Sequence, residues 1–165
     1  MFAHVKAPVD IGRPGEPRVL ACIVAYLASS GKVATSLPAT DRLGEDGVLQ
    51  ILGDRVVVQI VTINPRPAFW GSVARGSGEV MATLSAAVDW VHAAIDEKAK
   101  LYARADKVSM LLAVDVVHIG VLAGPDFAAR YQDRYGDPSV SSGFGAVWLV
   151  GPTERSVLCI GSSRW

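Results

Sequence analysis

Three residues of this chain carry groups that could do chemistry together on one face of a β-sheet. Asp46 precedes the β-rich run 48–52, Gln59 lies in the middle of the run 55–63, and Lys98 belongs to a later stretch with helical spacing. Carboxylate oxygens are ligands that Mg²⁺ prefers, and an amide can add a neutral oxygen. An ammonium group beside them could counter negative charge that develops in a reaction. Such a site depends on how a sheet and a helix place the three groups.

Gln59 draws attention because the strand around it is apolar. Val61 lies two positions further on, and side chains alternate between the two faces of a strand, so Gln59 and Val61 share a face. The link Gly53–Asp54 favours a hairpin between the two β-rich runs. We interpret Gln59 either as an amide bonded within the core or as a residue of a degenerate site.

The elements that must position these residues follow from the spacing of apolar side chains. Helical spacing alternates with short β-rich runs, and a polar connector (35–47) separates the first helix from the hairpin. The expected elements are a helix (18–31), a strand hairpin (48–52 and 55–63), a long helix (79–102), a buried strand (107–122), a short helix (124–138) and two strands (144–152 and 156–161).

This order predicts an α/β fold in which helices flank a mixed central β-sheet. A long helix between the hairpin and the apolar run 107–122 implies a crossover connection. The chain of 165 residues is long enough for one sizeable core, so we expect a single domain over 1–165, with an irregular lead-in over 1–16.

The composition bounds the function classes. Lys plus Arg and Asp plus Glu are 16 each, so the overall charge gives no argument for duplex nucleic acid as a partner. The apolar runs are shorter than the ~20 residues that cross a bilayer, which argues against a membrane protein. The first ten residues lack the apolar segment of a signal peptide, and we expect a cytoplasmic protein with Cys22 and Cys159 as reduced core thiols.

The order of helix, β-meander, helix and strand resembles the core of the PD-(D/E)XK nuclease superfamily, the restriction-endonuclease-like proteins. In that family an acid lies early in the meander, and a Glu/Asp-x-Lys triplet lies on the next strand. The early acid matches Asp46, or its neighbour Glu45, and the triplet matches "QIV" at 59–61. The helical acid that some members use falls near Glu16. The resemblance implies a metal-dependent phosphodiesterase, in which Mg²⁺ stabilises charge on the phosphate and the lysine holds the attacking water.

Two of the three signature positions depart from the family. Gln59 brings no charge, so a Mg²⁺ site built on Asp46 and Gln59, with Glu16, is expected to be weak, and Val61 cannot replace the lysine. Some members supply the basic group from the following helix, and Lys98 could do so here. The alternative for Lys98 is that its stem covers the edge of the core while its charge reaches water.

A second candidate site lies on the long loop "NPRPAFWGSVARGSG". Arg66, Phe69, Trp70 and Arg75 combine cationic and aromatic groups there. Such a loop could stack on the bases of single-stranded nucleic acid, or anchor a protein partner. The alternative is that Trp70 packs back onto the domain's own core.

One further group of polar residues has helical spacing. Asp89, His92 and Asp96 could share a face of the long helix and bind a metal, but this spacing is more typical of an exposed polar face.

Three functions remain open. The first, which we favour, is a nuclease-like domain with a degenerate metal site that acts as a nucleic-acid- or protein-binding or regulatory module. The second is an active Mg²⁺-dependent nuclease with a rearranged site of Asp46, Gln59 and Lys98. The third is an α/β protein-interaction scaffold of an unrelated fold. A homodimer is compatible with each of them.

Overall fold

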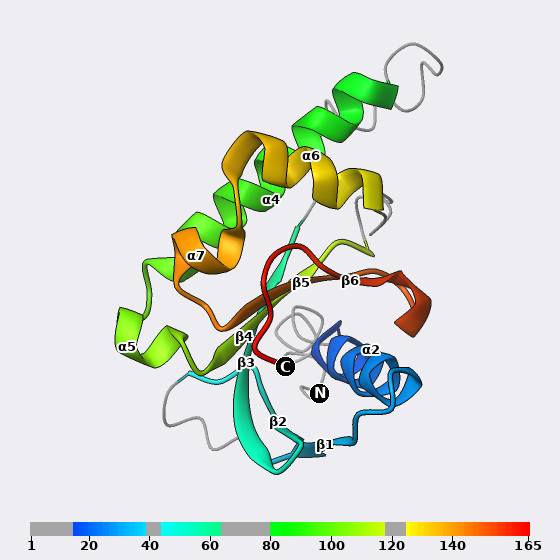
Figure 1. The fold of residues 1–165 in the computed structure, drawn as a ribbon, viewed down its shortest axis with the longest axis vertical. Helices are drawn as coiled ribbons and strands as arrows, with labels where there is room; N and C mark the ends of the chain where they lie inside the picture. The colour runs from blue at the N-terminus through cyan, green and yellow to red at the C-terminus, as the bar shows by residue number, and fades with distance from the viewer. Residues whose placement is uncertain (1–14, 39–43, 64–79, 118–124) are drawn as a thin grey trace, which may run out of the picture.

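The structure is a computed structural model that describes residues 15–38, 44–63, 80–117 and 125–165. Six strands of this part of the chain form one sheet, and helices cover both of its faces (Figure 1). The strands are β1 (Ala34–Leu37), β2 (Gly47–Ile51), β3 (Asp54–Thr62), β4 (Met110–Asp115), β5 (Ala146–Val150) and β6 (Val157–Cys159). The helices are α2 (Gly15–Ser29), α4 (Val80–Ala99), α5 (Arg104–Lys107), α6 (Pro125–Tyr135), α7 (Pro138–Ser142) and the 3₁₀ helix η3 (Glu154–Ser156).

The sheet is mixed, with its strands in the order β1-β2-β3-β4-β5-β6. β1, β2 and β3 form an antiparallel meander, β3, β4 and β5 run parallel, and β6 is antiparallel to β5. Parallel neighbours need a crossover, and α4 supplies it between β3 and β4. The predicted α/β fold with a mixed sheet flanked by helices is confirmed, as is the hairpin.

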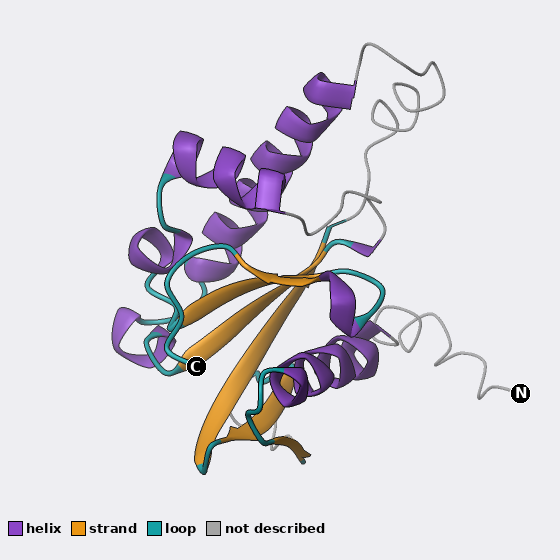
Figure 2. Cartoon of the chain, turned by 45° about the vertical axis from the view of Figure 1, so that its right-hand side comes forward, coloured by secondary structure: helices purple, strands orange, loops and turns teal. Residues whose placement is uncertain are grey.

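Two apolar layers hold the helices on the sheet, because the strand side chains alternate between its faces. One face of β3 carries Val56, Val58 and Ile60, which pack against α2. The opposite face carries Val57, which packs with residues of α4 and α6. Figure 2 shows α2 on one side of the sheet and the other long helices on the opposite side. The buried strand residues of β4 contribute to both layers, as expected of a central strand.

The structure corrects several expected boundaries. The polar connector 35–47 contains most of β1, in which Thr35 and Ser36 are exposed at the edge of the sheet. Helix α2 begins at Gly15, so only residues 1–14 of the expected lead-in lie outside the described residues. Lys107 belongs to the short helix α5 and not to a strand. A break at Gly136–Asp137 separates α6 from the additional helix α7.

A largely buried ion pair ties α2 to the end of the central strand β4. The Nη2 atom of Arg18 lies 2.5 Å from Oδ1 of Asp115, and Arg18 Nη1 donates to the backbone carbonyl of Gly151. The same Asp115 oxygen accepts a hydrogen bond from the backbone N–H of Val117 at 3.1 Å. The Asp115 side chain is only 2% exposed, and these partners compensate the free-energy cost of burying its carboxylate.

Asp137 caps α7 and also holds the segment that follows β6. Its carboxylate accepts hydrogen bonds from the backbone N–H groups of Ser139 at 2.9 Å and Ser162 at 3.0 Å. Burial disfavours the charged form, but these hydrogen bonds outweigh it and lower the pKa of Asp137. Asp137 therefore stabilises the fold in its ionised form.

We expect Asp137→Asn to lower the free energy of unfolding by about 1 kcal/mol at pH 7, because asparagine can still cap α7 at Ser139 but has no second oxygen to accept the hydrogen bond from the Ser162 N–H. A lowered pKa adds stability that is fully present above the ordinary Asp pKa of about 3.9. This stability is lost as the pH falls through the folded-state pKa. Urea unfolding at pH 7 and in strong acid checks this, and the difference between variant and wild type should shrink in acid. Asp133→Asn, on the exposed side of α6, is the control, and an equal loss there would contradict the prediction.

Cys22 and Cys159 are free thiols, and burial raises the pKa of Cys22. Among the described helices, none combines the length and the apolar composition needed to span a bilayer.

Candidate functional site

Asp46 lies at the start of β2, directly beside the middle of β3. The last paired residues of the hairpin are Gly47 and Val58, and the Oδ2 atom of Asp46 accepts a hydrogen bond from the backbone N–H of Ile60 at 2.8 Å. A Cβ at Gly47 would come within 2.7 Å of the Leu20 side chain, so this glycine lets α2 approach the sheet closely. The backbone of the hairpin thus positions the Asp46 carboxylate next to Gln59.

Lys98 reaches the same carboxylate from the last turn of α4. Its Nζ atom lies 3.1 Å from Oδ2 of Asp46, and the two side chains are 18% and 23% exposed. Ile95 and Ala99, which neighbour Lys98 on α4, are buried in the core. Lys98 therefore lies on the side of α4 that faces the sheet. The structure therefore brings together two of the three residues proposed for a rearranged site, while their roles in catalysis stay predictions.

Gln59 completes the local arrangement as a buried amide. Val58 and Ile60 face α2, so Gln59 faces the α4 side, as does the partly buried Val61. The Gln59 side chain is 0% exposed, and neither Oε1 nor Nε2 has a hydrogen-bond partner among the described residues. An unpaired buried amide costs free energy. This amide is therefore the polar group of β3 that a ligand or a further segment of the chain could satisfy.

The other acids proposed for the site have different surroundings. Glu45 is buried and pairs with Arg55, at 3.1 and 3.3 Å from the guanidinium Nη2, so Asp46 is the neighbour that meets Lys98. Glu16 lies in the first turn of α2, and α2 packs on the opposite face of the sheet from α4. The described residues contain no group of three or more His, Cys, Asp or Glu side chains placed to hold a metal.

The arrangement pairs an anion with a cation beside an uncharged amide. Asp46 is the carboxylate beside Gln59, and the Lys98 ammonium already neutralises it. Mg²⁺ would have to displace that ammonium, and it would gain only one charged ligand from the pair. The proposed binding residues Arg66, Phe69, Trp70 and Arg75 lie outside the described residues.

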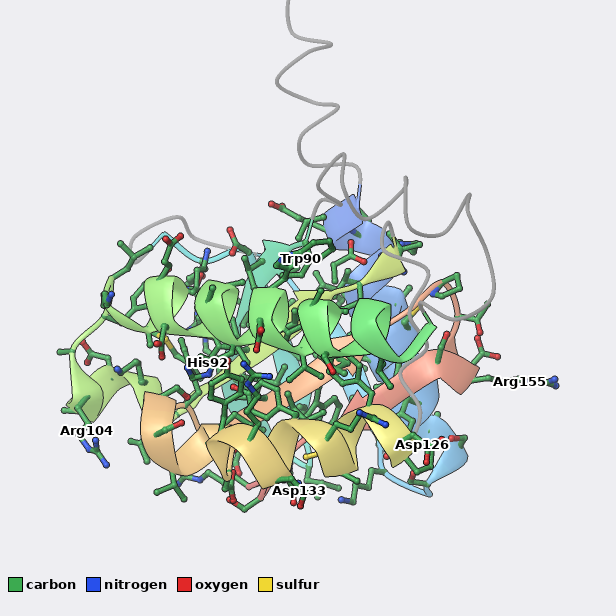
Figure 3. All side chains as sticks on the ribbon, turned by 90° about the horizontal axis from the view of Figure 1, so that it is seen from above. Trp90, His92, Arg104, Asp126, Asp133 and Arg155 are labelled. Atoms are coloured by element: carbon green, nitrogen blue, oxygen red, sulfur yellow. The ribbon has the colours of Figure 1, made fainter. Side chains whose placement is uncertain are left out.

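A second polar cluster lies between α4 and α6, of which the sequence indicated Asp89 and His92 but not their tyrosine partners on α6. The His92 Nδ1 atom lies 2.9 Å from the Tyr131 hydroxyl, and the imidazole stacks on the Tyr135 ring at a centroid distance of 3.6 Å. The Tyr135 hydroxyl donates to Asp89 at 2.6 Å, and Arg134 pairs with the same carboxylate at 3.1 Å. Figure 3 shows His92 between the two helices. The face that we expected to be exposed is thus half covered by α6.

Two pKa shifts describe this cluster. Burial raises the pKa of Tyr131 well above its ordinary value, and its hydrogen bond to Asp89 raises the pKa of Tyr135. Both hydroxyls therefore stay protonated, Tyr135 donates to Asp89, Tyr131 shares a hydrogen bond with the His92 Nδ1 atom, and the cluster joins α4 to α6. The aromatic residues at helical spacing in 127–135 were the signal that could have revealed it.

The comparisons with known proteins identify no relative of this chain. The chain shows no significant match to any protein-family model, any curated protein or any solved structure. Its function must therefore be argued from the geometry around Asp46, Gln59 and Lys98.

Proposed function

We propose that this chain is a PD-(D/E)XK-like domain with a degenerate metal site, which acts as a binding or regulatory module with little or no hydrolysis. The observation that supports this most is the ion pair of Asp46 with Lys98 beside the uncharged, buried Gln59. In the resemblance, Asp46 and Gln59 correspond to the two acids, the strand lysine corresponds to Val61, and Lys98 is the substitute from the following helix. The order of helix, meander, helix and parallel strand is also compatible with that core.

The charge balance argues for weak hydrolysis. A phosphodiesterase of this type needs a divalent cation, which two carboxylates would hold. Here Gln59 offers no charge, Val61 offers no polar group, and the ammonium of Lys98 occupies the remaining carboxylate. Metal binding must therefore compete with an existing ion pair and win without a second negative ligand.

We expect the wild-type protein to show no cleavage of single- or double-stranded DNA or RNA in Mg²⁺ or Mn²⁺, and Asp46→Asn to leave this result unchanged. Time courses on end-labelled substrates measure it. The same protein should bind its nucleic-acid or protein partner through the surface at Asp46 and Lys98, so Lys98→Met should weaken binding. Lys100→Met, at an exposed position next to the end of α4, should leave binding unchanged. Metal-dependent cleavage by the wild type would contradict the proposal.

A second function, an active Mg²⁺-dependent nuclease, is favoured by the 3.1 Å contact between Lys98 and Asp46. A lysine from the helix can stand in for the missing strand lysine, and it could release Asp46 to a metal when substrate binds. In that case cleavage should be lost in both Asp46→Asn and Lys98→Met, and kept in Asp54→Asn and Lys100→Met. Both controls alter exposed residues of the same charge.

The partner in the first proposal is a nucleic acid or a protein. Filter binding with single-stranded DNA and RNA tests the first class, and analytical ultracentrifugation tests a homodimer. The cytoplasmic location that the sequence favours also stays a prediction. A protein-interaction scaffold would follow if neither cleavage nor nucleic-acid binding were found.

A further inference from the structure

A groove lined by two arginines lies away from the Asp46–Lys98 pair. It has a volume of about 400 Å³, and it is formed by α5, α7, the start of β5 and the segment after β6. This volume is in the range of small-molecule sites. Arg104 and Arg164 line it from segments that are far apart in the sequence, and neither Asp46 nor Lys98 contributes to it.

The charge of the groove is one-sided. No Asp or Glu side chain lines it, and neither Arg104 nor Arg164 forms an ion pair with a carboxylate of the described residues. Lys107 does not line the groove, and its Nζ atom donates to the backbone carbonyl of Ala99 at 3.0 Å. The nearest capping carboxylate, Asp137, is engaged by two backbone N–H groups.

Backbone contacts hold Arg164 at the groove, and Arg104 lines it from the first turn of α5. The backbone N–H of Arg164 donates to the carbonyl of Gly145, and its Nη1 atom donates to the carbonyl of Val108 at 3.1 Å. Arg104 begins α5 and projects outward at one end of the molecule (Figure 3). Gly143 ends α7 with a φ of 89°, and a Cβ there would lie 3.6 Å from the Arg104 Cγ atom. The remaining N–H groups of both guanidiniums can donate to a ligand.

The other walls suit a ligand with an apolar part and polar oxygens. Val108 and Val140 are 50% and 66% exposed, and both line the groove. Ser162 adds a hydroxyl at the same place, whereas the Ser163 hydroxyl already donates to the Trp165 carbonyl oxygen at 2.9 Å. An anionic group on a small organic moiety would satisfy the arginines and cover the two valines.

We propose that this groove binds a phosphate monoester. Two guanidiniums carry a charge of +2, and a phosphate monoester carries about −1.5 to −2 at pH 7. A carboxylate or a phosphodiester carries only −1 and leaves half of the positive charge unmatched. Guanidinium forks also match the oxygens of phosphate in a bidentate manner. This proposal does not depend on the function proposed for the Asp46 site.

Isothermal titration calorimetry at low ionic strength tests the proposal with three probes that share one ring: phenyl phosphate, methyl phenyl phosphate and benzoate. Phenyl phosphate should bind saturably, and the other two about tenfold more weakly or worse. Arg104→Gln and Arg164→Gln should each weaken phenyl phosphate about tenfold, because each removes charge-assisted hydrogen bonds. Arg155→Gln, on the exposed helix η3, should leave the affinity unchanged.

The result that would overturn the assignment can be read from the same titrations. Absence of saturable binding, equal affinity in the double variant Arg104→Gln/Arg164→Gln, or benzoate bound as tightly as phenyl phosphate would each do so. Diester binding equal to monoester binding would assign the groove to a nucleic-acid backbone instead, and would overturn it as well. Unfolding temperatures of the variants, compared with wild type, establish that they are folded.

Discussion

Gln59→Glu is expected to destabilise the metal-free protein by about 3 kcal/mol and to make its stability depend on Mg²⁺ or Mn²⁺. The destabilisation arises because the new carboxylate would be fully buried, where an uncompensated charge is costly. The metal dependence arises because Asp46, just before β2, and the new acid on β3 would then offer two carboxylates on one face of the hairpin. At a metal concentration of 100 times Kd, binding would restore about 2.7 kcal/mol.

Thermal unfolding with and without each metal measures this effect. Wild-type protein should show no metal-dependent shift in Tm, because Gln59 leaves Asp46 as the single acid beside Lys98. Gln50→Glu is the matched control, since Gln50 lies on the neighbouring strand with an exposed side chain, and it should show neither effect. A Gln59→Glu protein that is destabilised but indifferent to both metals would count against the nuclease-like site.

Arg18→Met is expected to lower the free energy of unfolding by about 3 kcal/mol, which is among the largest effects of any single polar substitution in this chain. The arginine is bound to Asp115 and to the carbonyl of Gly151, and Asp115 is almost completely buried. Removing the arginine leaves that carboxylate without its counter-charge. Methionine keeps the length and apolar character of the stem, so the loss reports the charge and the hydrogen bonds.

Denaturant unfolding of a double-mutant cycle separates the ion pair from general packing. Asp115→Asn in the Arg18→Met background should recover part of the loss, because it removes the uncompensated charge. Arg155→Met, at an arginine that projects into solvent (Figure 3), should change the stability by less than about 0.5 kcal/mol. If Arg18→Met and Arg155→Met had equal effects, the pair would not be an important part of the fold.

Apolar periodicity was enough to predict the central architecture. The hairpin of β2 and β3, the crossover helix α4 and the buried strand β4 have strong patterns, because each must bury one or both faces in a continuous core. The class of fold follows from their order. The edge strand β1 could not be found in this way, since its outward residues are polar and its conformation is set by pairing with β2.

In the candidate site, too, local sequence patterns predicted some contacts and tertiary packing decided the others. The sequence itself determined that Asp46 and Gln59 lie close together at the open end of the β2–β3 hairpin, because hairpin register and strand alternation are local properties. Whether Lys98 reaches Asp46 depends on the rotation and depth of α4, which are set by its packing on the sheet. The contact of His92 with Tyr131 also depends on how the helices pack, and so does the presence of Arg104 and Arg164 in the lining of one groove.

Local pattern and tertiary packing therefore decided different parts of this protein. Secondary structure and core faces depend on residues a few positions apart, so the sequence by itself determined the mixed sheet and the strand that carries Gln59. Contacts across elements depend on the relative placement of whole helices, which no short-range spacing encodes. Only the tertiary structure decided that Lys98 neutralises that acid, and that two distant arginines share one groove.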